Sequence, residues 1–341
     1  MISRRTFFGA GAAAALTGCV TGTRNRDDCA PGCGACGSAR NRDDCATAGG
    51  ATVPVAHAFS LGQKLNLSLP RADVKEPVRV FVIGDTHWGF HDARDDAYAA
   101  NYKRMAQWPA PADALPKALK RAKDAKADLV VLVGDNISFP TQANIDHLKQ
   151  ALAEGGVDWM YVAGNHDWHF EGLPGSDIAQ RAEWAPKRLA PFYRGANPLM
   201  ASRVVKGVRF VTIDNSVYHI LPEQLAFWKA EAAKGDPIAL FMHIPLWVEG
   251  WGLFTCGNPG WGAATDPYWE IEQREKWAAR QTPETFAFRD AVLATPNLVG
   301  VFTGHEHRLM AAQVRNQLMF SVPSNRDGSC LDVTIGGPAF D

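Results

Sequence analysis

Five short apolar runs in this chain each end at a group of polar residues. The runs are rich in Val, Leu and Ile and have the length of buried β-strands. They cover residues 78–83, 129–133, 159–162, 238–241 and 298–302. Amphipathic stretches occur at residues 115–126, 143–154, 222–234 and 283–294. The alternation of the two kinds of segment predicts strands joined by helices in βαβ-type connections.

A second group of strand-like runs lies at residues 202–214, 309–314 and 317–322. Together with the first five runs, they predict a β core of two layers flanked by helices. Of the 341 residues, 46% are hydrophobic and 10% are aromatic, which is enough for one sizeable domain over residues 54–341. The net charge of −1 argues against a broad basic surface, so we expect no stable nucleic-acid partner.

Short polar motifs follow the first five apolar runs directly. In chain order they are Asp85-Thr86-His87, Gly134-Asp135, Gly164-Asn165-His166-Asp167, His243 and Gly304-His305-Glu306-His307. Ligands and catalytic groups of open α/β sheets gather at the carboxyl ends of the strands, where loops carry polar side chains outside the core. We therefore expect the five motifs to converge on one edge.

The residue types in these motifs are those of a metal centre. A single histidine is usually a hydrogen-bonded core or surface residue, but an ordered series of Asp, Asn and His after successive strands favours metal ligands. The set contains no thiolate, which argues against a closed structural zinc site and for an open hydrolytic one.

The ordered motifs resemble the signature of the calcineurin-like metallophosphoesterase superfamily, which is D-x-H, GD, GNH[D/E], a lone His and GHxH. The resemblance spans residues 78–321. It implies a four-layer α/β/β/α sandwich with a metal site at the carboxyl ends of the strands. It also implies hydrolysis of small phosphorylated substrates by a hydroxide that bridges two metal ions.

The resemblance assigns a role to each motif residue. Asp135 would bridge two ions, and Gly134 would let the backbone pass close to the site. His166 would stabilise or protonate the leaving oxygen. The first ion would be bound by Asp85, His87 and His307, and the second by Asn165, His243 and His305. Mn, Fe and Zn all suit this ligand set, so the identity of the metals stays open.

One position departs from the family pattern. Many members carry Asp three residues after the bridging Asp, and purple acid phosphatases carry an iron-binding Tyr there, whereas this chain has Ser138. The partner that orients His166 is therefore open between Asp167 and a hydroxyl.

We expect Asp85 and His87 to alternate along an extended segment. We expect the imidazoles of the last motif to point inward, with Glu306 directed elsewhere.

The substrate pocket is the least determined part of the site. Residues 247–281 form an insertion that is too long for a plain connection and contains five tryptophans, among them Trp247 and Trp251. It predicts a cap whose tryptophans either contact substrate or pack the cap onto the domain. Trp88 and His91 are further candidates for the pocket rim, with loop packing as the alternative. Phosphomonoester, phosphodiester and pyrophosphate substrates all remain open.

The N-terminus has the features of an export signal. Paired Arg4 and Arg5 precede a short apolar stretch, as in a twin-arginine signal, and Cys19 follows it as in a lipobox. Residues 1–19 therefore predict export by the Tat machinery, with lipidation at Cys19 as the membrane anchor. The alternative is an ordinary Tat signal with an unrelated Cys. The expected location is the periplasm or the cell envelope.

Residues 20–53 contain few large apolar side chains and predict a disordered tether. The tether repeats one heptapeptide, at residues 24–30 and 40–46, and contains four cysteines. Outside the cytoplasm such cysteines more often form disulfides than metal sites. Two function classes follow for the whole chain: an exported metal-dependent phosphoester hydrolase, or a non-catalytic metal-bound binding or scaffold module on the same fold.

Overall fold

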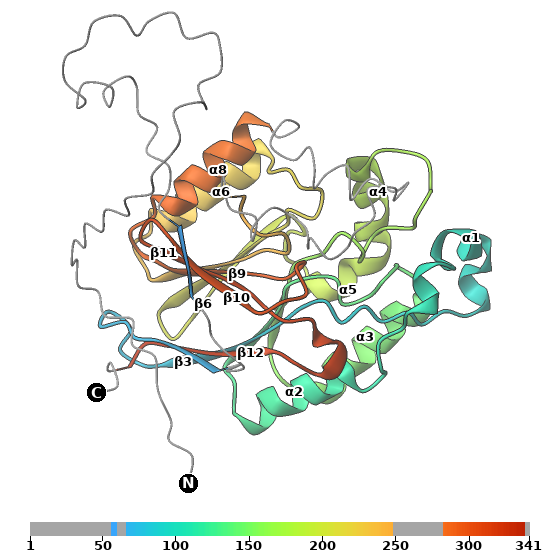
Figure 1. Ribbon diagram of the computed structural model, residues 1–341, viewed down its shortest axis with the longest axis horizontal. Coiled ribbons are helices and arrows are strands. Elements are labelled where there is room, and N and C mark those ends of the chain that lie inside the picture. Colours follow the sequence, from blue (N-terminus) through green and yellow to red (C-terminus); the bar gives the residue numbers. More distant parts are fainter. Residues whose placement is uncertain (1–55, 60–65, 248–281, 338–341) are drawn as a thin grey trace, which may run out of the picture. The chain divides into compact units, whose positions relative to one another are not determined.

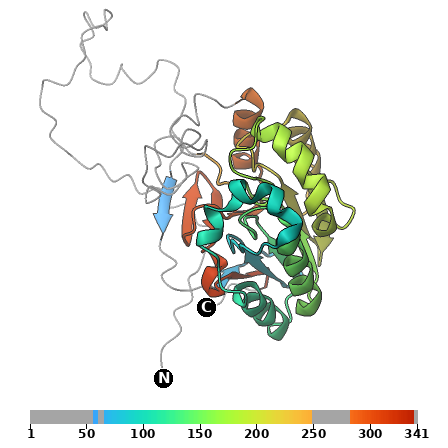
Figure 2. The same cartoon turned by 90° about the vertical axis from the view of Figure 1, so that its right-hand side faces the viewer.

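Two β-sheets pack face to face between two layers of helices in the computed structural model (Figures 1 and 2). The structure describes residues 56–59, 66–247 and 282–337. The predicted signal, tether and most of the cap insertion lie outside these residues. Within them, no helix combines the length and the apolarity needed to cross a bilayer.

One sheet has seven strands in the order β1-β10-β11-β9-β8-β7-β6. Its centre is parallel, from β11 through β9 and β8 to β7, and its edge pairs are antiparallel. The strands are β1 (Ala56–Phe59), β6 (Met200–Val205), β7 (Val208–Ile213), β8 (Ile238–Phe241), β9 (Leu298–Thr303), β10 (Met310–Val314) and β11 (Gln317–Ser321).

The other sheet has five strands in the order β2-β12-β3-β4-β5. β3, β4 and β5 are parallel, and β12 is antiparallel to β3 and parallel to β2. The strands are β2 (Asn66–Leu69), β3 (Val78–Ile83), β4 (Leu129–Leu132), β5 (Trp159–Tyr161) and β12 (Leu331–Ile335).

Side-chain alternation along the strands divides the core into three parts. In β3, Val80 and Val82 lie in the cluster between the two sheets, whereas Phe81 and Ile83 face the helices on the other side. β8 divides in the same way: Phe241 lies between the sheets, and its neighbours Ile238 and Leu240 face the other helical layer. Each fully buried side chain of this size contributes about 1.5–3 kcal/mol relative to exposure.

Four main helices form the outer layers. The helices α2 (Ala114–Asp124) and α3 (Gln142–Gly155) cover the five-stranded sheet, and α6 (Pro222–Ala232) and α8 (Pro283–Leu293) cover the seven-stranded sheet. α2 buries Leu115, Ala118, Leu119 and Ala122, the spacing of one helical face. Shorter helical segments are η2 (Ala93–Tyr98), α1 (Ala99–Tyr102), η3 (Met105–Gln107), α4 (Asp177–Trp184), η4 (Ala185–Leu189), α5 (Ala190–Tyr193) and η6 (Asn325–Asp327).

The four-layer α/β/β/α prediction is confirmed, and the five apolar runs are β3, β4, β5, β8 and β9. The run at residues 202–214 is not one strand but the hairpin of β6 and β7. Lys206 and Gly207, with φ of 48° and 79°, form its tight turn. The parallel connections β3-α2-β4-α3-β5 and β7-α6-β8-α8-β9 bring the carboxyl ends of both sheets to the motif residues.

Candidate metal centre

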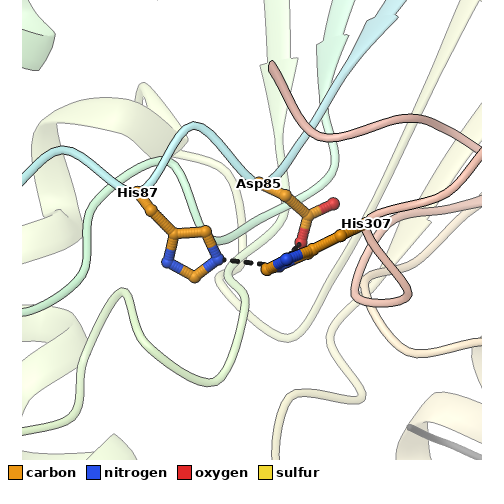
Figure 3. Close-up of side chains that lie close together, drawn as sticks. All are labelled: Asp85, His87 and His307. Carbon is orange, nitrogen blue, oxygen red and sulfur yellow. Dashed lines mark hydrogen bonds and ion pairs between the residues drawn. The ribbon is translucent and has the colours of Figure 1, made fainter. Parts of the chain in front are cut away.

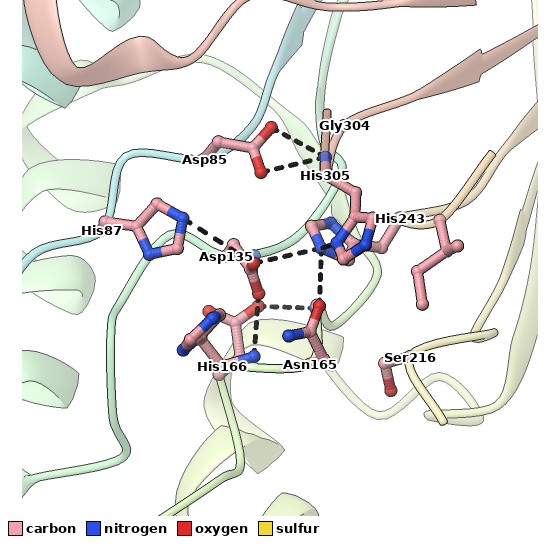
Figure 4. A network of polar contacts seen from close by, with 12 residues as sticks. Asp85, His87, Asp135, Asn165, His166, Ser216, His243, Gly304 and His305 are labelled. Atoms are coloured by element: carbon pink, nitrogen blue, oxygen red, sulfur yellow. Dashed lines mark hydrogen bonds and ion pairs between the residues drawn. The ribbon is translucent and has the colours of Figure 1, made fainter. Parts of the chain in front are cut away.

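The five motif segments converge in space, as Figure 4 shows. Each lies in the loop that directly follows a strand, from β3, β4 and β5 of one sheet and from β8 and β9 of the other. Three groups of side chains place potential ligand atoms within 4.8 Å of one another. The groups are Asp85, His87 and His307; His87, Asp135 and His166; and Asp135, His243 and His305.

The first group contains Asp85, His87 and His307 (Figure 3). Nε2 of His87 lies 2.9 Å from Nε2 of His307. Nε2 of His307 lies 3.4 Å from Oδ1 of Asp85. The Asp85 carboxylate also accepts the backbone N–H of His305, at 2.9 and 3.0 Å from its two oxygens. The last motif therefore positions the carboxylate of the first.

The second group is built around His243. Its Nε2 lies 3.1 Å from Oδ1 of Asn165 and 3.2 Å from Nδ1 of His305. Its Nδ1 lies 2.8 Å from the carbonyl oxygen of Val133. Because a carbonyl can only accept, Nδ1 is the donor, and the neutral imidazole presents a lone pair on Nε2. When that nitrogen carries no proton, it and the amide oxygen of Asn165 are two acceptors that face each other, an arrangement that suits a cation between them.

Asp135 lies between the two groups. Its Oδ2 is 3.1 Å from Nε2 of His243 and 3.7 Å from Nε2 of His87. Its Oδ1 accepts the backbone N–H of His166 at 2.9 Å. The carboxylate is almost fully buried, and a buried charge is stable only with a compensating partner. Imidazole, amide and carboxylate donors thus surround positions that fit two divalent cations sharing Asp135.

The backbone of the site is strained. Positive φ angles occur at Asp85 (58°), His87 (54°), Asp135 (50°), His305 (71°) and His307 (54°). Side chains other than Gly seldom adopt this conformation, which costs on the order of 1 kcal/mol or more per residue and is found at functional sites. The expectation of an extended segment from Asp85 to His87 is therefore wrong. Left-handed turns, rather than strand alternation, direct these side chains into the site.

Glu306 is directed away from the ligand groups, as expected, whereas His305 and His307 both belong to them. Its side chain is buried and forms an ion pair with Arg308, with 3.3 Å between the carboxylate and guanidinium atoms. The glycines of the motifs have the expected role. A side chain on Gly134 would collide with the backbone of Gly164, and one on Gly164 would collide with Asp135. The two loops pass each other at a distance that only Gly permits.

Asp167 fastens these two loops together. Its Oδ2 accepts the backbone N–H groups of Asp135 at 2.9 Å and of Gly164 at 2.8 Å, and its Oδ1 accepts that of Ile137 at 3.1 Å. The hydroxyl of Ser138 donates to the carbonyl of His87 at 3.2 Å. Both residues that the sequence suggested for orienting His166 thus hold the ligand-bearing loops.

His166 lies beside the first group, with its ring edge-on to His87 and 5.0 Å between ring centroids. Both imidazoles border a cavity of about 120 Å³. The cavity is lined by His87, Met105, Trp108, Asp135, His166, His305, His307 and Arg326. It gives a small substrate group direct access to the first group and to Asp135.

Charge and burial act in opposite directions on the two central histidines. Burial lowers the pKa of His87 well below its ordinary value, and nearby positive charges, including that of Arg326, reinforce the effect against Asp135. His87 is therefore neutral, the form that binds metals. Burial also opposes charging of His243, but the Asp135 carboxylate outweighs it and raises the pKa of His243 to about 9. A cation at Asp135 would compete with that proton.

Trp88, His91 and Trp247, the described substrate candidates, are not among the residues that line the cavity. Trp88 is buried, and its Nε1 donates to the carbonyl of Pro111 at 3.0 Å. His91 is exposed and lies against Tyr102. Trp247 packs edge-on against Phe286, with 6.0 Å between ring centroids. Trp251, like the lipidation candidate Cys19, is outside the described residues.

Three residues at the centre were missed from the sequence. The hydroxyl of Tyr218 lies 3.3 Å from Nε2 of His305, and Trp108 and Arg326 line the cavity. None of them belongs to a motif. Tyr218 follows β7, which carries no predicted ligand, and Arg326 follows β11, beyond the last motif.

Known proteins include several to which this chain is similar. A probable cyclic nucleotide phosphodiesterase from Psychrobacter arcticus is 29% identical over 271 residues, which cover 75% of this chain and 84% of that protein. A dimetal phosphatase from Danio rerio has 13% identity and a TM-score of 0.44, over 73% of this chain and 88% of that chain. A purple acid phosphatase from yellow lupin (Lupinus luteus) seeds has 14% identity and a TM-score of 0.44, over 80% and 48%.

The family model of the calcineurin-like phosphoesterases matches residues 78–309. This match covers most of the chain and includes all five motif segments. The chain therefore belongs to the calcineurin-like phosphoesterase family and is a metal-dependent hydrolase of phosphoric esters.

Proposed function

We propose that this protein hydrolyses phosphodiesters at a centre of two metal ions. The observation that carries the proposal is the position of Asp135, whose Oδ2 faces His87 on one side and His243 on the other. One carboxylate shared between two sets of ligands is the arrangement of two-metal hydrolytic sites, in which the ions lie about 3.5–4 Å apart.

The chain's own residues divide into two ligand sets. Asp85, His87 and His307 would hold one ion, Asn165, His243 and His305 the other, and Asp135 both. When bound, the two cations neutralise phosphoryl oxygens and supply the nucleophile from water. Mn, Fe and Zn all match these donors, and the set does not select among them.

His166 is proposed as the general acid. Its ring borders the same cavity as His87 and Asp135, and its backbone N–H holds the shared carboxylate. A proton on this imidazole would pass to the ester oxygen that leaves. The loops that Asp167 fastens together place His166 next to both ligand sets.

The preference for diesters is supported by the relative named as a probable cyclic nucleotide phosphodiesterase, which is 29% identical to this chain over 271 residues. The experiment compares metal-reconstituted turnover of bis-p-nitrophenyl phosphate and p-nitrophenyl phosphate, with the Asp135→Ala variant as blank. We expect faster release from the diester. Faster release from the monoester would overturn the diester preference. No release from either, with two metals bound, would favour the non-catalytic scaffold.

We also propose export by the Tat route and attachment to the membrane through lipidated Cys19, in the periplasm or the cell envelope. The support is the sequence of residues 1–19 alone. The test is fractionation of cells that express the wild type or the Cys19→Ala variant. The variant should move from the membrane fraction to the soluble fraction, and a wild type that is already soluble would contradict the anchor.

A further inference from the structure

The loop after β11 is fastened to the segment that carries Asp85. Ser324 Oγ donates to the carbonyl of Asp85 at 2.6 Å. The backbone N–H of Asn325 donates to the carbonyl of Gly84 at 2.9 Å, and Thr86 Oγ1 donates to Oδ1 of Asn325 at 3.0 Å. These three bonds fix the next residue, Arg326, relative to the first ligand set.

Arg326 carries a positive charge at the wall of the cavity that also contains His87, His166 and His307. Its Nη2 donates to the carbonyls of Trp108 at 2.8 Å and of Pro109 at 3.3 Å. Over residues 66–247 and 282–337, the structure gives it no carboxylate partner. Both of these bonds use Nη2, and within the described residues the structure gives Nε and Nη1 no hydrogen-bond acceptor.

Two other arginines follow or precede site segments in the chain, but neither lines the cavity, and both are paired with carboxylates. Arg308 pairs with Glu306 at 3.3 Å, and Arg181 pairs with Asp214 at 3.1 Å. Arg326 differs from both because only neutral carbonyls hold it. A planar guanidinium with free donors matches the geometry of phosphate oxygens, and its charge is stronger in a partly desolvated cavity.

Trp108 forms the neighbouring part of the same wall. Its side chain lines the cavity and is 69% exposed, the most exposed of the large hydrophobic residues in the described chain. A large exposed aromatic surface beside a catalytic cavity is typical of a binding surface. The bond from Arg326 to the Trp108 carbonyl keeps the two residues together.

We propose that Arg326 and Trp108 form the substrate-recognition wall of the cavity. Arg326 binds a phosphoryl oxygen of the ester, and the indole of Trp108 packs against its planar organic group, as in aryl or nucleoside esters. The inference rests on the proposed function. It assigns phosphate recognition to a residue outside the ligand sets.

The experiment measures three quantities on the metal-loaded protein: metal content, affinity for inorganic phosphate by calorimetry, and KM and kcat for bis-p-nitrophenyl phosphate. Arg326→Ala should keep both metals and weaken phosphate binding about 10- to 100-fold, the range for a lost charge-assisted hydrogen bond. Arg326→Gln keeps an N–H donor for the two carbonyls and removes the charge, so it should weaken phosphate binding similarly. It decides the matter if the Ala variant does not fold.

Arg121→Ala is the matched control. Arg121 is exposed and also donates to this loop, at the carbonyl of Gly328, but does not line the cavity. The Arg121→Ala variant should leave metal content, phosphate affinity and the kinetic constants unchanged. Trp108→Ala should raise KM for the aryl diester about tenfold, by loss of stacking, and leave phosphate affinity unchanged.

Wild-type phosphate affinity in Arg326→Gln, at full metal content, would overturn the role of Arg326. An unchanged KM in Trp108→Ala would overturn that of Trp108. If the wild type binds phosphate through Arg326 but hydrolyses neither ester, the proposed function fails while the phosphate site stands. Calorimetry therefore separates the two failures.

Discussion

The two halves of the metal centre differ in their exposure. His243, His305 and Asn165 are at most 1% exposed, whereas the side chain of His307 is 29% exposed. His87 and His307 border the cavity, and so does His305 of the other half. Asp85 and His87 are buried, so the difference lies at His307, which Figure 3 shows beside them. The half around His243 is therefore buried throughout, and the half around His307 reaches solvent through that one side chain.

The buried half also has supporting contacts behind two of its ligands. The carbonyl of Val133 accepts from Nδ1 of His243, and the Tyr218 hydroxyl lies near Nε2 of His305. Figure 4 shows the two histidines. Such partners orient ligands and raise metal affinity. Two ions that share Asp135, as proposed, would therefore not be held equally. We expect the ion of the buried half to bind more tightly and to exchange more slowly.

The largest effect is expected from Asp135→Ala, which removes the group that joins the halves. Both ions should be lost or weakly held, and turnover should fall by roughly 10³-fold or more, since metal charge stabilises the transition state by several kcal/mol. Metal analysis after gel filtration, with turnover on the same sample, checks this. Retention of two tightly bound ions would show that Asp135 is not the shared ligand.

A pair of variants tests whether the two halves hold their ions differently. His307→Ala should remove the exposed ion and leave about one ion per chain, because the buried ligands are intact. His243→Ala should release the buried ion and also destabilise the fold, because Asp135 and Asn165 lose their buried partner. Metal stoichiometry and thermal unfolding of the two variants provide the measurement. Equal behaviour would mean that the halves are equivalent.

His166→Ala separates catalysis from metal binding. The variant should keep both ions and slow turnover by roughly 10²–10⁴-fold, the range for general acid catalysis. The rate should fall less for esters with good leaving groups, which need no proton. A loss of metal instead would make His166 a ligand, and an unchanged rate would remove it from the mechanism.

The smallest effect is expected from Tyr218→Phe, which removes only the hydroxyl beside His305. Metal affinity of the buried half should fall by about tenfold, the lower end for a lost supporting partner. Competition with a chelator measures this, and the exposed ion should be unaffected. A selective loss of the exposed ion would contradict the assignment of His305 to the buried half.

The parts that sequence predicted are those with local signals. The strands before Asp85, Asp135 and His243 are continuous apolar runs, and the motifs follow them directly. β12 was missed because it joins β2 and β3 across most of the chain, a pairing that no local pattern encodes. The left-handed backbone at Asp85 and His305 was missed because only glycines signal positive φ in a sequence.

The residues of the cavity wall were missed for a related reason. Arg326 and Trp108 are far apart in the chain and meet through a guanidinium bond to a backbone carbonyl, which has no counterpart in residue type or spacing. For Trp88, which directly follows His87, the sequence left the pocket rim and loop packing open. Its indole is buried among core residues, which agrees with the packing alternative.

The central claim is that two ions share Asp135, and electron paramagnetic resonance of the Mn²⁺-loaded protein tests it most directly. At about 3.5–4 Å apart, two Mn²⁺ ions bridged by a carboxylate are magnetically coupled. We predict that the first equivalent of Mn²⁺ gives the signal of an isolated ion in the buried half, and that the second equivalent converts it to a coupled spectrum. Saturation at one equivalent, or two equivalents of uncoupled signal, would contradict it.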